Sequence, residues 1–216
     1  MAQKKIVITG AAGLVGQNLV TLLAGRPDLR LVAIDRHAHN LGVLARLHPA
    51  VTAVHADLAD PGPWEEHFAG ADAVVQLHAQ ITGKGAAPFV RNNIDATRRV
   101  LDVMRRHGVP YLVHVSSSVV NSVADDDYTR TKEAQEALVR ESGIPHCTLR
   151  PTLMFGWFDP KHLGWLARFL ERAPVFPIHG HGRYMRQPLY NRDFCRVIEV
   201  CLERRPQGEV WDLCGV

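Results

Sequence analysis

Three glycines at three-residue spacing follow a short apolar run near the start of the chain, in the stretch ITGAAGLVGQ from Ile8 to Gln17. The run from Lys4 to Thr9 is rich in β-branched residues and ends at glycine, which is typical of a strand buried in a parallel sheet. Leucine and valine at helical spacing then continue to Leu23. This order predicts either a plain turn between strand and helix, or a loop whose bare backbone holds a phosphate at the helix N-terminus.

The same alternation of apolar run and helical segment repeats along the first 150 residues. Strands are expected at 4–9, 29–35, 51–57, 71–79, 111–116 and 145–149, with helices at 14–23, 41–47, 63–68, 89–107 and 128–141. The later sequence is richer in proline and aromatic residues, with short helices expected at 163–170 and 194–203 and a strand at 209–213. This order predicts an α/β fold with a doubly wound parallel sheet, because parallel strands joined by helices need right-handed crossovers.

The composition fits one globular domain, because 46% of the 216 residues are hydrophobic and 22% are charged. A net charge of +3 leaves little excess of basic residues, so we expect no nucleic-acid partner. We expect no membrane span or secretory signal, because no run approaches about 18 apolar residues. The four cysteines lack C-x-x-C spacing and the histidines are scattered, so we expect no metal site and a cytoplasmic location.

A carboxylate at the end of the second expected strand favours the phosphate-binding interpretation of the glycines. Asp35 lies about twenty residues after the turn, where an acid can accept hydrogen bonds from both ribose hydroxyls of an adenosine. The acid would repel a 2′-phosphate, so NAD is favoured, and the neighbouring arginine keeps NADP as the second choice. The cofactor contacts expected here are Gly10, Gly13, Leu14, Val15, Gly16, Asp35 and Arg36.

A tyrosine and a lysine four residues apart are expected on one face of a later helix. The Lys132 ammonium and a positively charged nicotinamide ring would lower the pKa of Tyr128 toward neutrality and favour its phenolate. The phenolate could take a proton from a substrate hydroxyl while hydride leaves the adjacent carbon for the cofactor. One serine of the stretch from Ser116 to Ser118 would orient that oxygen. The alternative is an ordinary exposed pair, which the position downstream of a serine-ended strand disfavours.

Nine segments occur along the chain in one order: TGAAGLVG at 9–16, Asp35, the pair Asp57 and Leu58, LHAQ at 77–80, Asn93, VSSS at 115–118, Tyr128 with Lys132, LRPTLMFG at 149–156, and GHGRYMRQPLYNRDF at 180–194. Together they resemble the short-chain dehydrogenase/reductase superfamily, in its extended or atypical NAD-dependent epimerase/dehydratase branch. We expect an NAD-binding Rossmann domain at residues 1–150. Residues 151–216 are expected to form a small substrate-binding portion packed on the same domain.

The resemblance implies further contacts along the cofactor. Asp57 and Leu58 would hold the adenine, Ala79 and Gln80 would line the cofactor path, and Pro151 and Thr152 would lie beside the nicotinamide. Asn93 would help to hold an active-site water or a helix backbone, and the alternative is an ordinary polar residue on a long helix.

The resemblance also implies substrate contacts. It favours Ser117 for orienting the substrate oxygen, with Ser118 next. An arginine after the G-x-G loop would bind a substrate diphosphate, which assigns Arg186 and, beside it, Arg183; solvated loop charges are the alternative. Related proteins pair through the long helix and the Tyr128 helix, so a homodimer is expected by analogy.

These expectations lead to two hypotheses. The first is an NAD-dependent epimerase/dehydratase-type oxidoreductase that acts on a nucleotide sugar or a similar hydroxyl-bearing substrate through a transient keto intermediate. The second is a non-catalytic dinucleotide-binding sensor or assembly module of the atypical short-chain dehydrogenase type. The serine, tyrosine and lysine favour the enzyme. The module is favoured by the short spacing, since only ten residues separate Ser117 from Tyr128, and by the small portion expected after residue 150. Asn121, which stands where the family usually has a tyrosine, weighs against catalysis.

Overall fold

A computed structural model of the chain describes residues 3–159, 161–173, 175–178, 180–183 and 185–215. Within them, seven parallel strands form one sheet in the order β3-β2-β1-β4-β5-β6-β9. Their bounds are β1 Lys4–Thr9, β2 Leu29–Asp35, β3 Thr52–His55, β4 Ala73–Gln76, β5 Leu112–Val115, β6 His146–Pro151 and β9 Val210–Leu213. The strand order changes direction between β1 and β4, which confirms the doubly wound parallel sheet predicted from the sequence.

The central strand β1 shows why the apolar runs form this sheet. Ile6 and Ile8 face one layer of helices and Val7 faces the other, and none of the three is more than 2% exposed. Because both faces of the strand are covered, its successive residues Ile6, Val7 and Ile8 are all apolar instead of alternating with polar residues.

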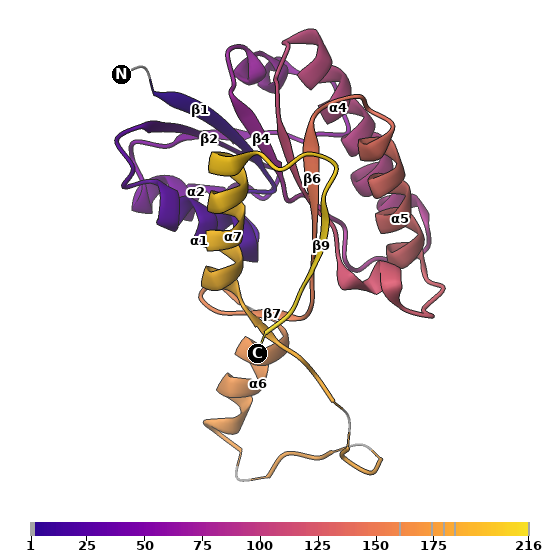
Figure 1. Ribbon diagram of the computed structural model, residues 1–216. Helices are drawn as coiled ribbons and strands as arrows, with labels where there is room; N and C mark the ends of the chain where they lie inside the picture. The colour runs from indigo at the N-terminus through magenta and orange to yellow at the C-terminus, as the bar shows by residue number, and fades with distance from the viewer. Residues whose placement is uncertain (1–2, 160, 174, 179, 184, 216) are drawn as a thin grey trace.

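Helices cover both faces of the sheet (Figure 1). On one face pack α1 (Leu14–Leu23), α2 (Ala38–Leu47) and α7 (Asn191–Arg204). On the other pack the 3-10 helix η1 (Pro63–Phe68), α4 (Ala96–Arg106) and α5 (Asp127–Arg140). The arrangement follows from amphipathic sequence: in α4, for example, Val100 and Met104 are buried while Arg98 and Arg105 point to solvent.

The long helix expected at 89–107 is divided in the structure. A short helix α3 (Ala87–Phe89) leads into the π-helical turn η2 (Val90–Asp95), and α4 follows. Asn93 lies in the π-helical turn and is fully buried. Such turns are often found at functional sites because they redirect a side chain within a helix.

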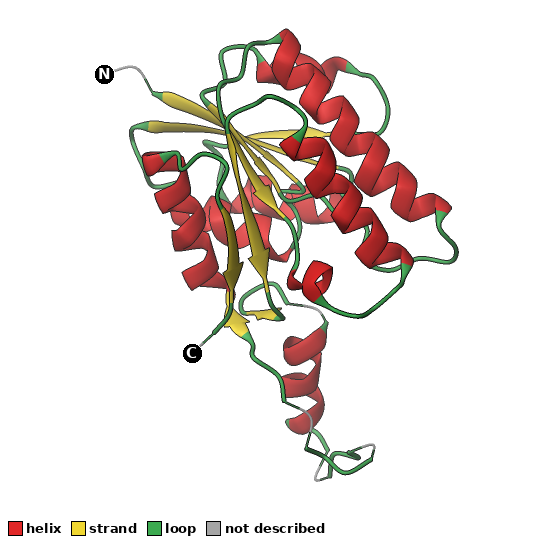
Figure 2. Ribbon diagram, turned by 45° about the vertical axis from the view of Figure 1, so that its right-hand side comes forward, coloured by secondary structure: helices red, strands yellow, loops and turns green. Residues whose placement is uncertain are grey.

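After β6 the chain first forms a small pair of strands and a helix, and then returns to the main sheet (Figure 2). The two-residue strands β7 (Met154–Phe155) and β8 (Leu189–Tyr190) pair in parallel, and α6 (His162–Leu170) extends beyond the carboxyl ends of the main strands. The chain then returns through α7 to β9, which pairs with β6 at the sheet edge. Residues after β6 therefore lie next to the carboxyl ends of the strands, where open α/β sheets bind ligands.

Candidate active site

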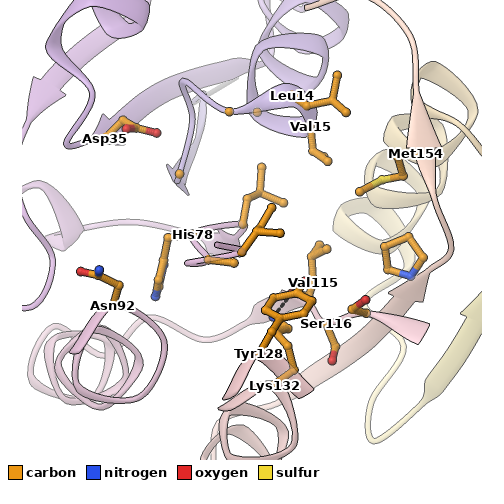
Figure 3. A pocket seen from close by; sticks show the side chains of 18 of the residues that line it. Leu14, Val15, Asp35, His78, Asn92, Val115, Ser116, Tyr128, Lys132 and Met154 are labelled. Carbon is orange, nitrogen blue, oxygen red and sulfur yellow. Dashed lines mark hydrogen bonds between the residues drawn. The ribbon is translucent and has the colours of Figure 1, made fainter. Parts of the chain in front are cut away.

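A cavity of about 550 Å³ lies at the carboxyl ends of the strands, at the point where the strand order changes direction (Figure 3). Most residues predicted from the sequence line it: Gly10, Gly13, Leu14, Val15, Gly16, Asp35, Arg36, Asp57, Leu58, Ala79, Ser117, Ser118, Tyr128, Lys132, Pro151, Thr152 and Arg186. Gln80, Asn93 and Arg183 lie outside this lining. The structure thus brings together residues from nearly the whole length of the chain.

The glycine turn has room for nothing larger than hydrogen at two positions. A Cβ on Gly10, which has a φ of +70°, would lie 2.6 Å from the backbone nitrogen of His78, and one on Gly16 would lie 2.4 Å from the carbonyl oxygen of Ala11. Gly13 is the N-cap of α1, without a side-chain cap, and the first turn of the helix carries no acidic residue. The free N–H groups and the helix dipole therefore fit an anion such as a pyrophosphate.

Asp35 links the glycine turn to the start of α2. One carboxylate oxygen accepts a hydrogen bond from the Ala12 N–H at 2.9 Å, and the other accepts one from the His37 N–H at 2.8 Å. The residue is 6% exposed and lines the cavity. Because each carboxylate oxygen can accept two hydrogen bonds, the fixed carboxylate retains capacity for ribose hydroxyls. Together with the bare turn, it fits the adenosine half of a dinucleotide.

The second expected acid, Asp57, is also held in place by hydrogen bonds. Its Oδ1 accepts a hydrogen bond from the Ala59 N–H at 3.0 Å, and its Oδ2 pairs with Arg91 at 2.8 Å. Burial acts to raise the pKa of Asp57, but these two hydrogen bonds outweigh it, so the pKa lies below its usual value. Asp57 is therefore a carboxylate at neutral pH, beside the buried side chain of Leu58.

Gln80 and Asn93 join the loop after β4 to the neighbouring helices. The Asn93 side chain accepts from the Gln80 N–H at 2.6 Å and donates to the Gln80 carbonyl at 3.1 Å and to Thr131 Oγ1 of α5 at 2.9 Å. The Gln80 side-chain oxygen accepts hydrogen bonds from Arg36 at 2.7 Å and from Asn92 at 3.0 Å. Both residues support the wall of the cavity instead of lining it.

The tyrosine and lysine project from α5 into the cavity, beside the end of β5 (Figure 3). Lys132 is 1% exposed, and its Nζ donates a hydrogen bond to the Val115 carbonyl at 3.0 Å. Burial lowers the pKa of Lys132 to about 7, and the carboxylate of Glu136 opposes this shift. Burial raises the pKa of Tyr128, while a hydrogen bond with Ser117 acts to lower it. Ser117, Tyr128 and Lys132 thus line one cavity.

Sequence reasoning assigned no role to several residues that line the cavity: His37, Ala56, Leu77, His78, Ile81, Asn92, Ala96, Val115, Val119, Leu153 and Met154. Most contribute apolar surface or backbone, for which spacing gives no signal. Among the polar ones, His78 lies near the end of an expected strand, a position that could have indicated a site residue. Its Nδ1 pairs with Thr9 Oγ1 at 2.9 Å, and burial, followed by the charge of Lys132, lowers its pKa to about 3.

The described residues contain no group of three or more histidine, cysteine, aspartate or glutamate side chains that could hold a metal ion. None of their helices has the length and apolar character needed to cross a membrane.

The fold and the site define an α/β dinucleotide-binding protein with the residues of an oxidoreductase. A model of the NAD-dependent epimerase/dehydratase family matches residues 6–214, and the chain belongs to this family. The match confirms the predicted family, the NAD-dependent enzyme class and NAD as the cofactor, and it favours the enzyme over the non-catalytic module.

Individual relatives agree with this assignment. The dTDP-glucose 4,6-dehydratase of Streptomyces griseus is 30% identical, over 97% of this chain and 73% of the relative. A low-salt glycan biosynthesis protein of Haloferax volcanii is 27% identical, over 96% of this chain and 76% of the relative. Among solved structures, UDP-glucuronic acid 4-epimerase from Bacillus cereus in complex with NAD superposes with a TM-score of 0.86 at 24% identity, over 98% of this chain and 79% of that one. The structural likeness confirms the fold.

Proposed function

We propose that the chain converts a nucleotide sugar by an NAD-dependent reaction of epimerase or dehydratase type, in which a substrate hydroxyl is oxidised to a transient keto group. One observation carries the proposal: Ser117, Tyr128 and Lys132 line the same cavity as the glycine turn and Asp35. A cofactor lying across the turn would therefore end near a residue able to remove a proton.

The names of relatives support the substrate class. The Streptomyces griseus relative is a dTDP-glucose 4,6-dehydratase, and the Bacillus cereus structure is a UDP-glucuronic acid 4-epimerase. Both names describe a sugar joined to a nucleoside diphosphate. In this chain Arg186 lines the cavity and supplies a guanidinium suited to a diphosphate, whereas Arg183 is exposed outside it. Arg186 is therefore the better candidate of the two for substrate binding.

Several polar residues of the cavity have proposed roles. NAD supplies the hydride acceptor when it is bound. Asp35 accepts hydrogen bonds from the ribose hydroxyls, and the N-terminus of α1 faces the pyrophosphate. Tyr128 takes the proton of the substrate hydroxyl on its phenolic oxygen, and Ser117 orients that hydroxyl. Burial raises the pKa of Tyr128, and the Ser117 hydrogen bond acts to lower it and so favours the phenolate. We expect the Lys132 ammonium to favour the phenolate further.

We further propose a cellular location and an oligomeric state. The protein works in the cytoplasm as a homodimer whose interface is formed by α4 and α5. These helices lie side by side on one face of the sheet (Figure 1), so a partner could cover both at once.

The first test is turnover by the Tyr128→Phe variant. The protein is incubated with NAD and a panel of UDP- and dTDP-sugars, and products are separated by chromatography. We expect conversion of at least one sugar by the unaltered protein and a loss of about 100-fold or more in the variant, because the proton acceptor is gone. NAD affinity, measured by calorimetry, should remain.

The matched control is Tyr111→Phe, which removes a buried tyrosine hydroxyl that donates to Pro206 O at 2.8 Å. Turnover in this control should stay within a few-fold of the unaltered protein. Equal turnover by Tyr128→Phe would disprove the catalytic role of Tyr128. Tight NAD binding without conversion of any sugar would instead support the non-catalytic module.

A further inference from the structure

A partly buried ion pair begins one helical turn after Lys132. Glu136 follows Lys132 by four residues on α5, so both side chains share one face of the helix. Arg150 of β6 donates two hydrogen bonds to the Glu136 carboxylate, from Nε to Oε1 at 2.9 Å and from Nη2 to Oε2 at 2.7 Å. Glu136 is 8% exposed, so this two-pronged contact is shielded from water.

The ion pair continues to the edge of the sheet. Arg150 Nη1 donates to Asn121 Oδ1 at 3.1 Å, and Asn121 Nδ2 donates to Asp212 Oδ1 of β9 at 2.6 Å. Asn121 is the residue that replaces the tyrosine usual in the family. Four polar side chains thus form a line from the face of α5 to β9, and the arginine at its centre has a fixed orientation.

Few charges face Lys132 apart from this ion pair. From its own helix come Tyr128 and Glu136, from the end of β4 comes His78, and from β5 comes His114. Burial lowers the pKa of both histidines well below neutrality, so both are uncharged at pH 7. The hydrogen bond that Lys132 makes goes to a neutral carbonyl.

Glu136 is therefore the anion that acts on Lys132 among these groups. Burial acts to raise the pKa of Glu136, but the hydrogen bonds from Arg150 outweigh it and keep the residue a carboxylate. An uncompensated ammonium buried beside Val115 would lose its proton readily, since burial disfavours the charged form.

We propose that Glu136 is a positioning residue for the reaction, which keeps Lys132 an ammonium, and that Arg150 supports this effect by holding Glu136 as a carboxylate in a fixed orientation. The proposal rests on the proposed role of Lys132 beside Tyr128. It makes the charge of Lys132 depend on two side chains that do not line the cavity.

Two variants test the two residues. Glu136→Gln removes the anion, so Lys132 should lose its proton at a pH lower by about one unit or more. Arg150→Met removes the hydrogen bonds that hold Glu136 as a carboxylate, so the same midpoint should also fall, by a smaller amount. A purely structural ion pair would lower stability in both variants and leave the midpoint in place.

The chain offers a direct measurement, because it contains only five lysines: Lys4, Lys5, Lys84, Lys132 and Lys161. NMR of protein labelled with ¹³C at the lysine Cε, titrated from pH 5 to 10 without cofactor, gives one midpoint for each, and Lys132→Met assigns the Lys132 signal. Glu133→Gln is the matched control, since it removes an exposed charge next to Lys132 in sequence. It should leave the midpoint within a few tenths of a pH unit.

The pH profile of turnover is the second readout. If Lys132 must be charged, the alkaline loss of activity should move to lower pH in both variants, and further in Glu136→Gln, parallel to the NMR midpoints. Midpoints that stay fixed, or that rise in either variant, would overturn the proposal about Glu136. Midpoints that move as expected in a protein that turns over no sugar would uphold it and overturn the proposed function alone.

Discussion

At the scale of single residues, Asp35 combines structural and binding roles in one carboxylate. Its two oxygens hold the Ala12 and His37 N–H groups, so the acid fixes the glycine turn before any ligand arrives. A preorganised acceptor of this kind loses little conformational freedom when the ribose binds. The same fixed charge would repel the 2′-phosphate of NADP.

This arrangement predicts the effect of Asp35→Ala. The variant loses the ribose acceptor and leaves the backbone donor of Ala12 without its partner, so the dissociation constant for NAD should rise by about 10-fold or more. Affinity for NADP should fall less, because a repulsive charge is removed at the same time. Calorimetry with both cofactors checks this. Unchanged affinity for NAD would contradict the assigned role.

The sequence could predict the positions of site residues that depend on a single helix or strand. Tyr128 and Lys132 lie four apart on a helix, and Asp35 ends a strand, so both placements follow from periodicity alone. The partners of Gln80 and Arg36 could not be predicted in this way, because their hydrogen bond spans 44 residues of sequence. The Glu136 and Arg150 ion pair was missed for the same reason, since it depends on how α5 lies over β6.

At the scale of elements, the close contact between α1 and the glycine turn sets the position of the helix. Gly16→Ala would place a methyl group 2.4 Å from the Ala11 backbone, so α1 must shift. We expect a loss of about 1–3 kcal/mol in the free energy of unfolding, as in other overpacked sites, together with weaker NAD binding. Urea unfolding and calorimetry give the two values.

Gly42 in α2 provides the matched control for this substitution. A Cβ there would meet no atom within 4 Å, so Gly42→Ala should increase stability by about 0.5–1 kcal/mol through helix propensity. Similar effects at both glycines would show that Gly16 has no special contact.

The elements themselves were predicted with different success. The strands of the main sheet and the helices α1 and α5 fall within a few residues of the predicted ranges, because long apolar periodicity dominates there. The π-helical turn η2 was not predicted, since it depends on the hydrogen bonds of Asn93 to Gln80 and Thr131. β7 and β8 were not predicted because two residues are too few to show a period.

At the scale of the whole molecule, a buried histidine makes stability depend on pH. His114 of β5 is fully buried, and neither ring nitrogen has a hydrogen-bond partner among the described residues. Burial, followed by the nearby Lys132 charge, holds its pKa well below its usual value. In the unfolded chain the ring takes up a proton below about pH 6.5, so stability is full above that pH and falls as the pH decreases.

The sign of this dependence gives a prediction for His114→Gln. Each pH unit below about 6.5 should cost the unaltered protein about 1.4 kcal/mol through this one residue, so the loss between pH 7 and 5 should be about 2 kcal/mol smaller in the variant. Urea unfolding at the two pH values measures the difference. The exposed His39→Gln variant is the control and should keep the original dependence.

The architecture of the whole molecule was the most predictable level. Alternating strand and helix patterns fix a parallel sheet, and the family match over residues 6–214 agrees with it. The division at residue 150 and the homodimer stay predictions. The first depends on how the residues after β6 divide between α6 and the main sheet, which local periodicity does not describe.

The Asn93 contacts join two walls of the cavity. One buried amide fastens the loop after β4 to α5. Met154 and Arg186 line another part of the cavity and make none of these contacts. Because a single side chain makes all three hydrogen bonds, its loss would release the loop and the helix from each other at once.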